Sequence, residues 1–307
     1  MNNRTEKYTF EIEYEKRKAE KYAFLSAAEK GNIAIVEIFL KREGDIEVQD
    51  YRGNTAVFKA AYNGHMAIVK LLIEKGAKIY CTALSGAAAK GHMAVVKFLL
   101  EKVTNKEKMD KDNWGNTALI AAIRHSQTDI AKLLVEDGAD IYATDAYRET
   151  ALSIAASRNN IAFVEFLLEK GVGVNTTNGY GRAPLHLAAS KGHINLVKLL
   201  LRKNANVNAK NDHERIPLYG AVRHGHEEVV KLLMSEGADI ENIDRHNQVV
   251  FDVAASNGHM GVVKLLVEAA SHIEDKKRHW RRMIKIAAPN GHMDVVKFLE
   301  TELAASK

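Results

Sequence analysis

The stretch Arg182–Asn208 reads RAPLHLAASKGHINLVKLLLRKNANVN, and it decides how the chain folds. Its first half predicts a short helix rich in small residues, which Gly192 ends because glycine adopts a positive φ at little cost. Its second half repeats apolar residues at helical spacing, with Leu196, Val197 and Leu200 on one face, and predicts a second helix. The stretch is therefore a helix-turn-helix unit.

The same unit recurs along the chain. Four of its glycines are spaced by 33 residues, and the same period places Asn159 and Ser126 in earlier glycine slots. This gives nine units between Lys21 and Leu303. A single unit cannot bury its own apolar face, so we expect stacking of neighbours to create the core. A Gly-His pair followed by an apolar run occurs at Gly64, Gly91, Gly192, Gly225, Gly258 and Gly291.

This pattern resembles the ankyrin-repeat signature, which Arg182–Asn208 carries almost completely. Thr55-Ala56, Thr117-Ala118 and Thr150-Ala151 keep the signature's threonine in other units. The resemblance covers roughly nine tenths of the chain. It implies an all-α solenoid of helix-turn-helix units with short β-hairpin fingers, and a chain that binds another macromolecule.

The domain organisation follows from the repeat. We predict an N-terminal extension or capping helix over residues 1–20, the solenoid over 21–303 and a tail over 304–307. The alternating pattern of Tyr8–Tyr14 fits a strand instead, and the sequence leaves that alternative open. The third unit reaches its threonine slot six residues early, at Thr82, so its finger is expected to be missing. Pro289 is placed late in the first helix of the last unit, which caps the array.

Composition limits the classes of protein. The chain has a net charge of +5 and is 46% hydrophobic and 27% charged, which is typical of a folded soluble protein. No signal peptide or membrane-spanning run is evident, and the lone Cys81 favours a reducing compartment, where we expect it to be a small buried residue. We therefore predict a cytoplasmic protein. The basic run Lys276–Arg282, placed in the last finger, leaves the nucleus as an alternative.

In the ankyrin family, partners usually contact the finger tips and the ends of the first helices, on the concave side. Carried onto this sequence, these positions form an aromatic and imidazole ladder together with a row of basic residues. Rigid rings are enriched in binding hot spots, and clustered positive charge favours acidic partners. The predicted partner-binding residues are Trp114, Tyr147, Tyr180, His213, His246, His279, Arg124, Arg158, Arg182, Lys191, Arg215 and Arg223.

The resemblance and these residues together predict a monomeric interaction scaffold that binds an acidic or phosphorylated protein segment. Two alternatives stay open, namely nucleic-acid binding by the same face and delivery as an effector into a host cell, as some all-repeat relatives are. Rings at finger tips also pack on adjacent fingers, and basic residues there are ordinary solvated surface. These plainer interpretations stay open as well.

Catalysis, metal and cofactor binding are not expected. The sequence has no phosphate loop, no dinucleotide fingerprint and no Cys or carboxylate partners at ligand spacing from His213, His224 and His226. We predict no enzymatic activity, no cofactor, no small-molecule substrate and no membrane association. The six histidines that follow repeat glycines are expected to bond the backbone at the start of the second helix.

Overall fold

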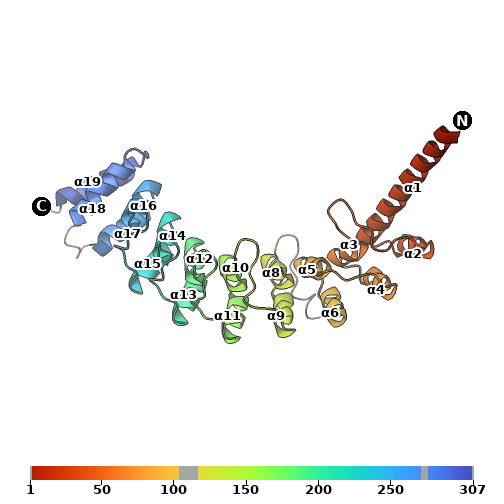
Figure 1. Cartoon of the computed structure of the whole chain (residues 1–307). Helices are drawn as coiled ribbons and strands as arrows, with labels where there is room; N and C mark the ends of the chain where they lie inside the picture. Colours follow the sequence, from red (N-terminus) through yellow and green to blue (C-terminus); the bar gives the residue numbers. More distant parts are fainter. Residues whose placement is uncertain (1, 104–116, 271–275, 306–307) are drawn as a thin grey trace. The chain divides into compact units, whose positions relative to one another are not determined.

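The computed structural model describes residues 2–103, 117–270 and 276–305, and in these residues 18 helices form nine successive pairs (Figure 1). The chain divides into two compact units, residues 1–146 and 147–307. The first unit holds α1 (Asn2–Lys30) with α2 (Ile33–Lys41), α3 (Ala56–Tyr62) with α4 (Met66–Glu74), α5 (Cys81–Lys90) with α6 (Met93–Lys102), and α8 (Ala118–Arg124) with α9 (Thr128–Glu136).

The second unit is the longer and more regular array. Its pairs are α10 (Ala151–Ser157) with α11 (Ile161–Glu169), α12 (Pro184–Ser190) with α13 (Ile194–Arg202), α14 (Pro217–Arg223) with α15 (Glu227–Ser235), α16 (Val250–Asn257) with α17 (Met260–Ala269), and α18 (Lys276–Ala287) with α19 (Met293–Ala305). The first helices of neighbouring pairs contact one another, from α10 through α12, α14 and α16 to α18.

The core lies between repeats, as expected for units that cannot bury an apolar face alone. Ala188 and Ala189 of α12 are fully buried, and their small side chains let the first helices approach closely. Val197 and Leu200 of α13 are also fully buried, and each such aliphatic side chain stabilises the fold by about 1.5–3 kcal/mol. The predicted class, an all-α array of stacked helix-turn-helix repeats, is confirmed.

Each of the six repeat histidines joins its own repeat to the one before it. Nε2 of His226 lies 3.1 Å from the carbonyl oxygen of Ser190, and Nε2 of His259 lies 3.0 Å from that of Arg223. Backbone bonding by all six is confirmed, but the acceptor is the end of the preceding repeat's first helix. The remaining four contacts are His65 to Glu29, His92 to Tyr62, His193 to Ser157 and His292 to Ser256, at 2.9–3.2 Å.

The fingers that carry Tyr180, His213 and His246 are each held by an Asn or Asp at the base. Oδ1 of Asn178 accepts hydrogen bonds from the amides of Tyr180 and Arg182, both at 3.0 Å. Asn211 and Asp244 do the same in the next two fingers. These bonds add to one backbone bond across each base, from the amides of Asn178, Asn211 and Asp244 to the carbonyl oxygens of Arg182, Arg215 and Gln248, at 3.0 Å. The residue two positions after the base becomes the tip.

The third repeat has no finger. Helix α4 of the second repeat is followed by Gly76 and Ala77, and α5 already begins at Cys81 with Tyr80 as its N-cap. Cys81 is half-buried at the first position of the helix, so the expectation of a buried thiol was wrong. The reason is the same deletion, because without a finger this position sits at the start of a helix rather than under a hairpin.

The two ends of the array differ from the sequence prediction. The strand interpretation of Tyr8–Tyr14 is wrong, since α1 is one helix from Asn2 to Lys30 with no break at residue 20. This segment contains neither Gly nor Pro, so nothing in it interrupts a helix. In the last repeat Lys276–Arg282 lies in α18, not in a finger, Pro289 follows α18, and α19 continues to Ala305.

The glycine slot of the fourth repeat offers a test of backbone strain. Ser126 has a φ of 58° and Asn159, in the next slot, a φ of 56°, and both residues are exposed. We expect Ser126→Gly to raise the free energy of unfolding by about 0.5–1 kcal/mol, because it removes the left-handed penalty of a side chain. Asn159→Gly is the matched control and should gain less, since Asn tolerates this conformation. Urea denaturation measures both, and equal gains would contradict the explanation.

Candidate functional site on the finger face of the second unit

The finger tips of the second unit form a row of exposed rings. The side chains of Tyr147 and Tyr180 are 59% and 42% exposed. His213 and His246 are exposed as well, and their ring centroids lie 6.3 Å apart in a stacked arrangement. We call these four tips, together with the C-terminal ends of the first helices α10, α12 and α14, the finger face. Trp114, the other aromatic residue of the predicted ladder, lies outside the described residues.

Four of the predicted cations are available on the finger face. Arg158, Arg182, Lys191 and Arg223 are exposed, and none of them forms an ion pair with a carboxylate of the described residues. The guanidinium of Arg182 lies 5.8 Å from the Tyr180 ring centroid, close enough for a cation–π contact. These residues present positive charge to solvent, which an acidic group would neutralise.

Two other predicted cations are paired within the protein. In the first unit Arg124 pairs with the carboxylate of Asp145. In the second, Nε of Arg215 lies 2.8 Å from Oδ2 of Asp244, whose side chain is only 1% exposed. Burial would raise the pKa of Asp244, but hydrogen bonds from Gln248, Arg215 and His246 outweigh it and hold this pKa below its usual value. Arg215 therefore ties its own finger to the next one.

His279 does not continue the row of tips. It lies in α18, where its ring packs on Phe251 with centroids 4.7 Å apart, and its side chain is 18% exposed. The period of 33 residues places His279 in a tip slot, but α18 begins where the earlier repeats have a finger. The row of tips observed in the second unit therefore ends at His246.

A hollow of about 250 Å³ opens on the finger face between α12 and α14. It exists partly because α14 carries Gly220 at the position where α12 has Leu187 and α16 has Val253. A Cβ at Gly220 would lie 2.9 Å from Cβ of Ser190, so glycine also lets the two helices approach. We call this hollow the α12–α14 pocket. Its polar lining includes Arg182, His186, Ser190, His213, Arg223 and His224.

Sequence reasoning missed Gly220, although the signal was present in the repeat alignment. A single small residue in a helix position that is otherwise Leu or Val leaves space where the side chain is missing. It also lets the neighbouring helix approach closely. His224 was noticed as part of a local histidine cluster but was not chosen as a site residue. Its Nδ1 lies 2.9 Å from the carbonyl oxygen of Gly220 and 3.4 Å from Oγ of Ser190.

His186 forms the buried base of the pocket. Its Nδ1 accepts the amide of Ala183 at 3.1 Å, so Nε2 carries the proton and donates to the carbonyl oxygen of Arg215 at 2.9 Å. Burial lowers the pKa of His186, and the charge of Arg182 lowers it further. The imidazole is therefore neutral and structural, and it caps α12 while supporting the finger that follows.

The lowered pKa of His186 makes stability depend on pH. The unfolded chain binds a proton at this residue below about pH 6.5, whereas the folded chain resists it, so stability should fall as pH drops from 7.5 to 5. We expect His186→Gln to lower the unfolding midpoint in urea at pH 7.5 and to reduce its further fall at pH 5. His226, whose pKa burial also lowers, keeps part of the dependence. An unchanged pH dependence in the variant would contradict this role.

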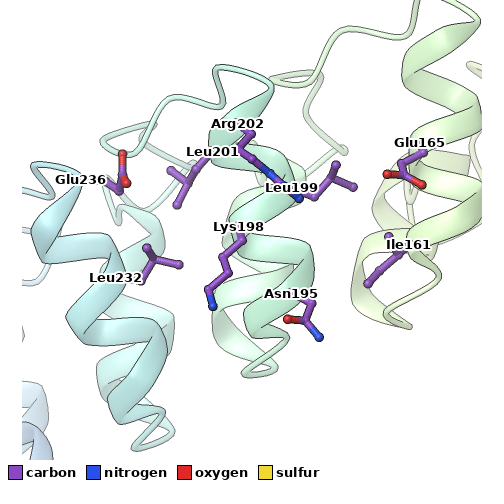
Figure 2. Close-up of a pocket in the computed structure, with 9 residues that line it drawn as sticks. All are labelled: Ile161, Glu165, Asn195, Lys198, Leu199, Leu201, Arg202, Leu232 and Glu236. Atoms are coloured by element: carbon purple, nitrogen blue, oxygen red, sulfur yellow. The ribbon is translucent and has the colours of Figure 1, made fainter.

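A larger hollow on the opposite face serves as a comparison. It measures about 580 Å³ and is bordered by α11, α13 and α15 (Figure 2). Lys198 and Arg202 of α13 line it, and so do Glu165 and Glu236, so its charges balance. The α12–α14 pocket has arginines and histidines but no acidic residue in its lining. Charge, rather than size, therefore distinguishes the finger face.

Residues 2–103, 117–270 and 276–305 contain no group of three His, Cys, Asp or Glu side chains arranged to hold a metal ion. None of the helices in these ranges is long and apolar enough to cross a membrane.

Comparison with known proteins gives a consistent picture. A family profile described as ankyrin repeats (3 copies) matches residues 9–83, 77–145, 152–244 and 218–305. The chain is 27% identical over 126 residues to potassium channel AKT2/3 of Arabidopsis thaliana, which covers 40% of this chain and 16% of the channel. It is 41% identical over 59 residues to inversin of Danio rerio, covering 19% of this chain and 6% of inversin. The likeness thus spans a small part of both relatives.

Proposed function

Because the chain belongs to the ankyrin-repeat family, whose members are protein-interaction modules, we propose that it binds an acidic segment of a protein partner on the finger face. One observation carries the proposal. Exposed rings share the finger face with cations that have no carboxylate partner among the described residues, whereas the larger hollow of Figure 2 has balanced charge. The chain acts in this proposal as a non-catalytic scaffold.

The rings and the charges of the finger face would contribute to binding in different ways. Tyr147 and Tyr180 offer large contact areas with few rotatable bonds, so ordering them on binding costs little entropy. Arg158, Arg182 and Arg223 attract an acidic segment and form charge-assisted hydrogen bonds with its carboxylates. The finger that carries Tyr180 and Arg182 is held by Asn178 at its base, so this part of the surface is formed before the partner arrives.

Affinity capture with matched variants tests the proposal. The finger variant is Tyr147→Ala/Tyr180→Ala, and the control is Lys198→Ala/Arg202→Ala on the opposite face. All four side chains are solvent-accessible, so both variants should keep the fold, which circular dichroism checks. We expect the finger variant to lose a protein that the wild type and the control both retain. Recovery of the same proteins by all three would refute the proposal.

Nucleic-acid binding is the second candidate, and the exposed tyrosines favour it because bases stack on aromatic rings. Its signature is a steep salt dependence, since each phosphate contact releases counterions. For a chain that makes six or more phosphate contacts, affinity for a single-stranded oligonucleotide should fall by a factor of about 300 or more between 50 and 200 mM salt, at a logarithmic slope of about 0.7 per contact. A captured protein whose binding withstands this salt change supports the first candidate.

A further inference from the structure

We propose that the α12–α14 pocket is a receptor for the phosphate group of a phosphoserine or phosphothreonine in the partner segment. The inference rests on the proposed function, because it assumes that a protein segment crosses the finger face. It adds a chemical class of ligand and a set of residues that recognise it.

Two arginines give the pocket positive charge that no carboxylate of the described residues neutralises. Arg182 and Arg223 come from the finger before α12 and from the end of α14, and both line the same hollow. Neither pairs with a carboxylate in the described residues, whereas Arg215, which also lines it, is held by Asp244. Asp212 is exposed in the neighbouring finger but is not part of the lining. Two guanidinium groups are therefore free to bind one anion.

Hydrogen-bond donors in the pocket fit three acceptor oxygens. The carbonyl oxygen of Gly220 can only accept, so Nδ1 of His224 carries a proton and donates to it at 2.9 Å. The hydroxyl of Ser190, 3.4 Å from that nitrogen, keeps its own proton for another acceptor. Two arginines and this hydroxyl offer more donors than the two oxygens of a carboxylate use. A phosphate monoester, with three acceptor oxygens and a charge near −2, matches them better.

The shape of the pocket agrees with this ligand. Its volume of about 250 Å³ equals that of roughly eight water molecules, at about 30 Å³ each, which is room for a phosphate and the side chain that bears it. The absence of a side chain at Gly220 keeps this space open. His186 at the base is neutral, and both of its ring nitrogens are bonded to backbone groups. Neither nitrogen is therefore available to bind the anion.

Nuclear magnetic resonance of arginine side chains tests the inference on the chain of residues 1–307. The probe is N-acetyl-phosphoserine methylamide, compared with the matching serine and glutamate compounds. Replacing Arg182 and Arg223 by lysine one at a time assigns their Nε–Hε signals. We expect both signals to shift with phosphoserine at a concentration at least tenfold lower than with glutamate, and not to shift with serine. Arg182→Gln/Arg223→Gln should weaken binding at least tenfold, and Lys198→Gln/Arg202→Gln should not.

Two outcomes would overturn the inference. An equal response to the glutamate and phosphoserine probes would show that the pocket binds acidic groups in general. That result would leave the proposed function intact. A response of the same signals to a short oligothymidylate without any response to phosphoserine would assign the pocket to nucleic acid. Failure of the proposed function is seen separately, as identical capture by the wild type and the finger variant.

Discussion

Replacing Gly225 with alanine lowers the free energy of unfolding by about 2–4 kcal/mol, which is the sum of backbone strain and overpacking. Gly225 has a φ of 73°, where a side chain is strained, and a Cβ there would lie 2.8 Å from Nδ1 of His259. The imidazole cannot move away freely, because its Nε2 is bonded to the carbonyl oxygen of Arg223. Loss of that bond adds about 1 kcal/mol to the cost.

Gly237→Ala is the matched control. Gly237 has a φ of 84°, but no atom lies within 4 Å of the Cβ that would be added. This variant should therefore show the backbone penalty alone, about 1 kcal/mol. Urea denaturation of both proteins measures the difference, which is the energetic contribution of the glycine–imidazole contact between repeats. If the two substitutions cost the same, the contact does not join the repeats as described.

The second large effect is expected at Arg215. Arg215→Ala removes the partner of Asp244, whose side chain is 1% exposed and keeps its bonds to the amides of His246 and Gln248. Removing one member of a buried ion pair costs about 3–5 kcal/mol, and the remaining amide bonds reduce this to about 2–3 kcal/mol. The variant also loses the stacking of the guanidinium 4.1 Å from the Tyr219 ring centroid.

Arg182→Ala provides the comparison, since both residues lie in adjacent fingers and both were predicted to bind the partner. Arg182 is exposed and has no carboxylate partner among the described residues, so its loss should change stability by no more than about 0.5 kcal/mol. Thermal and urea unfolding of the two variants measure the contrast. A large loss of stability from Arg182→Ala would mean that this residue is structural and would remove it from the site.

Most of the fold is predictable from the sequence because the repeat fixes it. A glycine slot needs a positive φ, and a histidine after it can reach the preceding helix end only if the units stack. The period fails where a unit departs from it. His279 occupies a tip slot by counting, but no Gly, Asn or Pro lies between Lys276 and Ala287, so the segment is helical. The N-terminal alternation misleads for a similar reason, since the long uninterrupted run favours a helix over a strand.

The site is less predictable, because the pairing of a charge depends on residues far away in the sequence. Arg182 and Arg215 occupy the same position in successive fingers, but only Arg215 has an acidic residue, Asp244, at the base of the following finger. The corresponding residue for Arg182 is Asn211, which carries no charge. Aligning the repeats before choosing site residues reveals this difference. The α12–α14 pocket follows in the same way from Gly220.

Photo-crosslinking from single positions tests the central claim, that a protein partner binds the finger face of the second unit. A benzophenone amino acid is placed at Tyr180 in one protein and at Lys198 in another, and each is irradiated in extract beside the captured partner. We predict a crosslink to the partner from position 180 that excess unlabelled wild type removes, and none from position 198. Crosslinking from position 198 with none from position 180 would contradict the account.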